Sequence, residues 1–161
     1  MAASSASRRQ ARVGVNAGDP EQEAVGPHHP AQATTDSLMI LIAGPYASGT
    51  GGDPALMRRN LDRLEEAAWP LFEAGHIPMI GEWVALPVLS SAGASGPTDP
   101  LAEKVMYAVA HRLLQRCDAV LRLPGESRGA DQDVAITRER GIRVYTALHD
   151  VPGVAWREAF H

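Results

Sequence analysis

Apolar residues fall along the chain in short uninterrupted runs, separated by stretches in which they recur at helical spacing. The run over 38–43 has no polar alternation, which predicts a strand covered on both faces, as in a parallel sheet. Three further runs predict strands at 76–80, 119–123 and 142–145. Pro78 in the second run predicts a strand near the sheet edge, or at its own start.

The stretches between these runs predict helices. Asp53 and Pro54 have the types expected of a cap and a first helical residue, and this helix should end near Gly75 with Pro70 kinking or tightening its last turn. Similar signals predict a helix from Thr98 to about Gln115, on which apolar residues recur at Leu101, Val105, Val109 and Leu113.

The remaining assignments complete an alternating pattern. A helix is predicted over 131–140 and stopped by Gly141, and 81–97 is expected to form a short helix followed by a mobile loop. Strands alternating with helices imply right-handed crossovers. We therefore expect a three-layer α/β domain, flavodoxin-like or Rossmann-like, with a mainly parallel sheet of four to five strands.

Composition divides the chain into parts. Residues 1–37 contain no aromatic side chain and too few large aliphatic ones to offset the entropy of ordering, so we expect a disordered leader. Residues 38–150 should form one domain, because 161 residues with 45% hydrophobic composition can bury one core. Residues 151–161 are expected to be a C-terminal tail.

Charge and cysteine content narrow the classes of partner. The net charge is −4 and no basic block follows a helical face, so nucleic acid and membrane surfaces are not expected partners. The single cysteine, Cys117, permits no internal disulfide and suggests a reducing, cytoplasmic environment. The histidines show no metal-ligand spacing, and no apolar run approaches the ~20 residues of a membrane span. No metal or cofactor is expected.

Two loops lie where ligands bind in such a fold, outside the carboxyl ends of the strands. They are 44–52 and 124–130, and the second opens a helix that carries Asp131 and Asp133. A strand-to-helix turn offers free N–H groups and the positive end of a helix dipole, which suit a phosphate. Neither loop is a standard nucleotide motif, since Thr50 stands where a Walker loop needs lysine and the dinucleotide glycine pattern is absent.

The chain resembles the nucleoside 2-deoxyribosyltransferase-like superfamily, including its deoxynucleotide N-hydrolase branch and allied uncharacterised domains, over about 38–145. Four pieces in order carry the resemblance: Ile42-Ala43-Gly44-Pro45-Tyr46, Ala74-Gly75-His76, Cys117-Asp118-Ala119-Val120, and Ser127-x-Gly129-Ala130 with an acid four residues after that glycine. It implies cleavage or transfer of the N-glycosidic bond of a nucleoside or its 5′-monophosphate by a carboxylate nucleophile. It also implies homo-oligomers, for which the apolar patch over 83–89 is a candidate contact.

The resemblance assigns roles by position. Asp133 matches the nucleophile and Tyr46 the tyrosine that assists it, while Ser127, Gly129 and Ala130 match the loop that holds the 5′ end of the ligand. Arg128 is a plausible phosphate partner. The remaining candidate ligand contacts are Gly44, Pro45, Ser48, Glu82 and Trp83.

Two departures from the family pattern leave alternatives open. The family usually has glutamate where this chain has Asp133, and a family aspartate falls here on Ala110. Asp131 could replace Asp133 as the nucleophile, and Glu82 could protonate the leaving base. The two aspartates could equally well only complement the helix dipole.

Three functions are therefore weighed. They are an N-glycosidase or deoxyribosyltransferase, a binding module that holds a nucleotide-derived metabolite without turning it over, and a regulatory or interaction domain. Trp83 could belong to the core or stack on a base, and Tyr46 could be a packing residue or a ligand contact.

Overall fold

The computed structural model describes residues 36–155. The strands are β1 (Met39–Ala43), β2 (Ile77–Ile80), β3 (Ala119–Arg122) and β4 (Arg143–Tyr145). The helices are α1 (Pro54–Glu65), α2 (Ala68–Glu73), α3 (Gly81–Ser91), α4 (Pro100–Leu114) and α5 (Arg128–Glu139), followed by the 3-10 turn Leu148–Asp150. The predicted leader lies outside the described residues except for Asp36 and Ser37, and the predicted tail is described only as far as residue 155.

The four strands form one parallel sheet in the order β2-β1-β3-β4. This confirms the expected α/β class and the parallel sheet. Pro78 lies in the edge strand β2, where a residue without an N–H group is tolerated. Strand order reverses between β1 and β3, because the chain leaves β1 toward one edge and β3 toward the other. Ligands bind in such a fold outside the carboxyl ends of the strands at this point.

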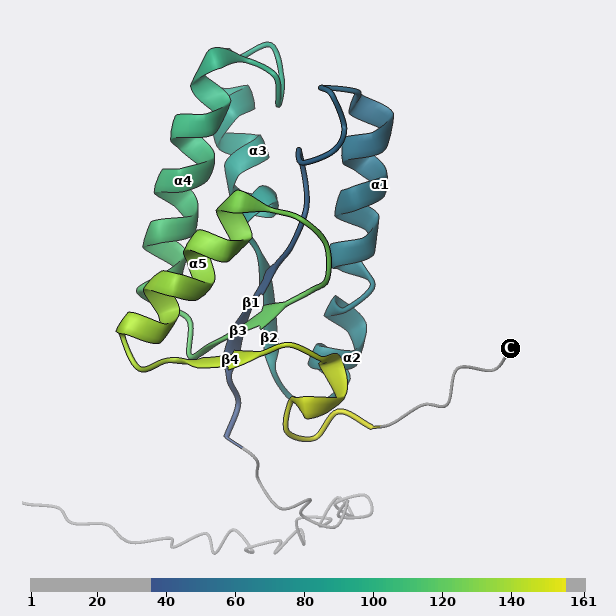
Figure 1. Cartoon of the computed structure of the whole chain (residues 1–161), viewed down its shortest axis with the longest axis vertical. Helices are drawn as coiled ribbons and strands as arrows, with labels where there is room; N and C mark the ends of the chain where they lie inside the picture. The colour runs from purple at the N-terminus through teal and green to yellow at the C-terminus, as the bar shows by residue number, and fades with distance from the viewer. Residues whose placement is uncertain (1–35, 156–161) are drawn as a thin grey trace, which may run out of the picture. The chain divides into compact units, whose positions relative to one another are not determined.

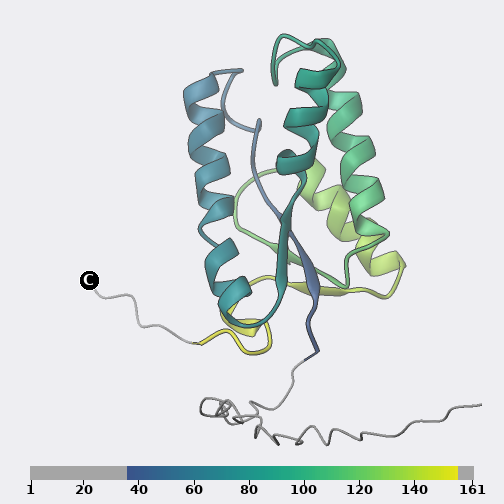
Figure 2. The ribbon, with the colours of Figure 1, turned by 180° about the vertical axis from the view of Figure 1, so that it is seen from behind.

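Helices cover both faces of the sheet, which gives three layers (Figures 1 and 2). On one face α1 and α2 pack on alternate residues of β1, including Ile40 and Ile42. On the other face Leu41 and Ala43 pack with residues from α4 and α5. Both faces of β1 are therefore buried, which explains its continuous apolar run. None of the helices over 36–155 is both long and apolar enough to cross a membrane.

The first predicted helix is broken into α1 and α2. The break falls at Glu66 and Ala67, ahead of the kink predicted at Pro70. Proline cannot donate to the carbonyl four residues earlier, but the first turn of a new helix needs no such bond. Pro70 therefore lies in the first turn of α2 instead of tightening the end of one long helix.

The last predicted helix begins earlier than expected, at Arg128 instead of Asp131. Ser127 is its N-cap, and the Ser127 hydroxyl accepts a hydrogen bond from the Ala130 N–H at 3.2 Å. Asp133 consequently lies in the second turn of α5, not at the helix start. The buried side of α4 also differs from the predicted apolar repeat, because Ala102 is buried whereas Leu101 is 36% exposed.

Candidate functional site

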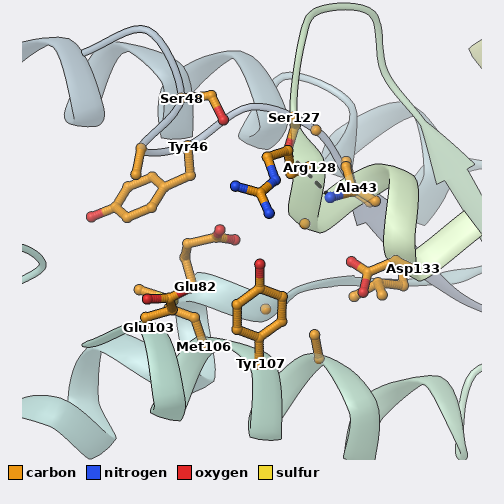
Figure 3. Close-up of a pocket in the computed structure, with 18 of the residues that line it drawn as sticks. Ala43, Tyr46, Ser48, Glu82, Glu103, Met106, Tyr107, Ser127, Arg128 and Asp133 are labelled. Atoms are coloured by element: carbon orange, nitrogen blue, oxygen red, sulfur yellow. Dashed lines mark hydrogen bonds between the residues drawn. The ribbon is translucent and has the colours of Figure 1, made fainter. Parts of the chain in front are cut away.

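A cavity of about 390 Å³ opens at the carboxyl ends of the strands, beside the point where strand order reverses. Its walls come from β1 and the loop after it, the starts of α3 and α5, and one side of α4 (Figure 3). The cavity brings together nine of the residues named from the sequence: Gly44, Tyr46, Ser48, Glu82, Ser127, Arg128, Gly129, Ala130 and Asp133.

Three residues named from the sequence do not line this cavity. Pro45 lines a separate hollow beside α1, and the Trp83 indole N–H donates to Glu65 Oε1 at 2.9 Å. Asp131 forms an ion pair with Arg122 at 2.9 Å, and its side chain is 70% exposed. Of the two aspartates that the sequence offered as nucleophile, therefore, Asp133 lines the cavity and Asp131 does not.

The start of α5 leaves backbone N–H groups beside the cavity. The Ser127 hydroxyl accepts from the Ala130 N–H, and the N–H groups of Arg128 and Gly129, in the first turn, have no partners within the helix. A Cβ placed on Gly129 would meet no atom within 4 Å, which leaves room beside these groups. The Arg128 side chain points into the cavity (Figure 3), and it forms no ion pair with any residue in 36–155.

Three carboxyl groups line the cavity, and two of them, those of Glu82 and Asp133, are less exposed than that of Glu103. Glu82 stands in the first turn of α3, directly after β2, and Asp133 stands in the second turn of α5. Both are half-buried. Figure 3 shows them on either side of Tyr107, whose hydroxyl points toward Arg128. Two acids held in one cavity form a pair that can divide the roles of nucleophile and proton donor.

The surroundings of these acids favour their protonated forms. The pKa of Asp133 is raised to about 7, mainly by burial and also by the negative charge of Glu82, while the Arg122 guanidinium opposes both effects. Burial also raises the pKa of the Glu82 carboxyl above its ordinary value. Near neutral pH Asp133 is therefore partly protonated, and burial increases the fraction of Glu82 that keeps its proton.

Tyr46 is held at the rim of the cavity by its backbone. The Asn60 side-chain amide on α1 donates to the Tyr46 carbonyl at 2.8 Å. Burial, with the nearby charge of Glu82, raises the pKa of the Tyr46 phenol, so its hydroxyl remains a hydrogen-bond donor. Gly44 precedes it at a position without space for a side chain, since a Cβ there would lie 2.7 Å from Leu64 Cδ2.

The wall of the cavity that α4 forms was not predicted from the sequence. Glu103, Met106, Tyr107 and Ala110 all line the cavity. Their spacing of three, four and seven residues marks one helical face and is a signal that was available. Ala110, the position on which the family's aspartate falls, lies in this wall, so the cavity holds no carboxylate there.

The described residues contain no group of three or more His, Cys, Asp or Glu side chains that could hold a metal ion. No protein-family model and no curated protein matches the chain.

Asp133→Asn is expected to stabilise the fold at neutral and alkaline pH. The pKa of Asp133 rises from 3.8 to about 7 on folding. Its protonated form is therefore favoured in the folded state, and the associated stability is fully present below pH 3.8 and lost as pH rises through about 7. Asparagine carries no charge and avoids this loss. Allowing for screening, we expect a gain of about 1–3 kcal/mol near pH 8.

Denaturant unfolding at several pH values measures this gain. The difference between Asp133→Asn and the wild type should be small near pH 4 and should grow up to about pH 8. A difference that stays constant over this range would show that Asp133 is not held in a site that disfavours its charge.

Proposed function

We propose that the protein cleaves or transfers the N-glycosidic bond of a nucleoside or nucleoside 5′-monophosphate, with Asp133 as the nucleophile. One observation carries this proposal: a single cavity holds two half-buried carboxyl groups together with a cation and free N–H groups at a helix start. Its volume, about 390 Å³, lies within the range of small-ligand sites. The resemblance of the chain to the nucleoside 2-deoxyribosyltransferase-like superfamily points to the same reaction.

The proposed reaction uses the two acids differently. Ionised Asp133 forms a bond from its carboxylate oxygen to the anomeric carbon while the bond between that carbon and the base breaks. The electron pair of the broken bond goes to the base nitrogen, which takes the proton of Glu82. Tyr46 lies on the Glu82 side of the cavity, across from Asp133 (Figure 3), so its hydroxyl donates a hydrogen bond to the ligand and not to the Asp133 carboxylate.

The second half of the reaction returns both acids to their starting states. Water loses a proton to the Glu82 carboxylate and attacks the anomeric carbon, and the Asp133 carboxylate departs. If a second base takes the place of water, the same steps transfer the sugar. The first half needs Asp133 ionised and Glu82 protonated. A pKa of about 7 leaves part of Asp133 ionised near neutral pH, and burial favours the protonated form of Glu82.

The next prediction concerns Arg128 and the preference for a 5′-monophosphate over its nucleoside. A 5′-monophosphate should bind more tightly than its nucleoside, because the phosphate meets the Arg128 guanidinium and the free N–H groups of α5. Arg128→Ala should remove most of that preference, about 1.5–3 kcal/mol or roughly 10- to 150-fold in affinity. Calorimetry with matched nucleosides and monophosphates measures both quantities.

Arg59→Ala is the control for this variant. Arg59 is exposed on α1 and does not line the cavity, so its loss removes one positive charge without touching the site. It should leave the preference for the monophosphate intact. Equal affinities of the wild-type protein for a nucleoside and its monophosphate would show that the site does not bind the phosphate group.

Ala110 favours a second candidate function. Its position lies in the cavity wall, and there the family's pattern has an aspartate. A site that lacks this acid, and whose nucleophile is one methylene shorter than glutamate, fits a module that binds a nucleotide-derived metabolite without turning it over.

Two measurements on the full-length protein distinguish the candidates. A ligand that binds the native state raises the melting temperature, so a panel of nucleosides and monophosphates identifies what binds. Chromatography of the same mixtures then measures free base. Binding with base release supports the enzyme, and binding alone supports the binding module. The absence of both would contradict each of them.

A further inference from the structure

The guanidinium of Arg122, the last residue of β3, donates hydrogen bonds to several acceptors. Its Nη2 donates to the Gly125 carbonyl at 2.8 Å and to Asp131 Oδ1 at 2.9 Å, and its Nε reaches the same carboxylate oxygen at 3.3 Å. Its Nη1 donates to the Leu123 carbonyl. The Arg122 side chain is only 15% exposed. This one side chain therefore joins the end of β3, the loop after it and the first turns of α5.

The loop held by Arg122 also packs on the loop after β1. Gly125 has a φ of +115°, and a Cβ placed there would lie 2.7 Å from Pro45 Cγ. Pro45 directly precedes Tyr46, whose carbonyl is fixed by Asn60. The contacts thus run without interruption from Asp131 through Arg122 and Gly125 to the loop that carries Tyr46.

From these contacts we propose that Arg122 is a positioning residue of the site. It holds the β3–α5 loop against both α5 and the β1 loop, and so fixes Arg128 and Asp133 relative to Tyr46. The role rests on the proposed function only in taking Asp133 as the reacting group. It also gives Asp131 a function outside the cavity, as the anion that anchors the guanidinium.

Arg122 acts on Asp133 electrostatically as well. The charged and titratable groups that line the cavity with Asp133 are Glu82 from α3, Glu103 and Tyr107 from α4, Tyr46 from the β1 loop, and Arg128 from α5. Burial and Glu82 raise the pKa of Asp133, and the positive charge of Arg122 lowers it. Without that charge, Asp133 would ionise at higher pH.

The test compares Arg122→Met with Arg122→Lys in the full-length protein. Carbon-13 NMR of the side-chain carboxyls follows the ionisation of Asp133 without any ligand. We expect the pKa of Asp133 to move upward in Arg122→Met and to remain closer to the wild-type value in Arg122→Lys, which keeps the charge. Arg143→Met is the matched control, because Arg143 lies over the Tyr145 ring in β4 and not at the cavity.

Affinity for deoxyadenosine 5′-monophosphate is the second readout. Both Arg122 variants should bind it roughly tenfold or more weakly, because lysine cannot donate to two carbonyls and a carboxylate in the fixed geometry of a guanidinium. If the pKa of Asp133 is unchanged in Arg122→Met, the charge of Arg122 does not act on Asp133. If a folded Arg122→Lys binds the nucleotide as tightly as the wild type, Arg122 does not position the site. If the wild type does not bind this nucleotide, affinity is measured with the monophosphate that most raises its melting temperature. If no monophosphate or nucleoside does so, the proposed function fails, while the ligand-free titration still tests Arg122.

Discussion

Asp133→Asn is expected to lower the rate of base release by about 10³-fold or more while nucleotide affinity stays within a few-fold of the wild type. The amide has nearly the shape of the carboxylate, so the cavity and the free N–H groups of α5 remain. It carries no negative charge and cannot form the bond to the anomeric carbon. Initial rates of base release give the loss, and calorimetry with the same nucleotide gives the affinity.

Asp62→Asn is the matched control, since Asp62 lies exposed on α1 outside the cavity. It should leave the rate unchanged. The outcome that would contradict the assignment is a full rate with Asp133→Asn and a lost rate with Asp131→Asn. That result would place the chemistry beside Arg122, on the exposed side of α5.

Glu82→Gln is expected to lower base release by about 10²–10⁴-fold, because glutamine cannot give a proton to the departing base. The pH dependence of the remaining activity should also change in a defined direction. Of the two acids only Asp133 then titrates, and without the negative charge of Glu82 its pKa falls below about 7, so the acid limb of the remaining activity should lie below pH 7. The alkaline limb, which depends on protonated Glu82, should disappear. A pH–rate profile measures both limbs.

Glu139→Gln, on the exposed end of α5, is the control for Glu82→Gln. It should leave the profile in place. A Glu82→Gln protein with a normal rate would show that Glu82 does not donate the proton, and an acid limb at or above pH 7 would show that the charge of Glu82 does not act on Asp133.

Much of the fold could be predicted because β1 is apolar throughout and the other strands are short and mostly apolar. The residues of β1 that face α1 and α2 and those that face α4 and α5 are both buried, so no polar alternation hides the strand. Pro78 marked the edge for the equally local reason that it lacks an N–H group. The place of the cavity followed from the parallel order, which brings two loops to one end of the sheet.

The choice between Asp131 and Asp133 could not be made from the sequence. Two residues along a helix differ by about 200° around its axis, so only one of these side chains can face the cavity. Which one does so depends on where α5 begins. Ser127 caps the helix, so α5 begins at Arg128, three residues before the predicted start. The ion pair between Asp131 and Arg122 is a tertiary contact, and no local sequence pattern predicts it.

The contribution of α4 was missed because its apolar repeat was assigned by hydrophobicity alone. Val109 is buried as the repeat predicts, but at the start of the helix small Ala102 packs inward while larger Leu101 remains partly exposed. Polar Glu103 and Tyr107, which hydrophobicity does not mark, line the cavity. Trp83 likewise carried no sign that its indole would bond to Glu65 on α1.

The most direct test of the central claim is chromatographic measurement of free base after incubation of the full-length wild-type protein with nucleosides and their 5′-monophosphates. The account predicts base release from at least one of these compounds, and none above background from the same compound with Asp133→Asn. A wild-type protein that binds a monophosphate, as shown by a raised melting temperature, yet releases no base from any compound would contradict it.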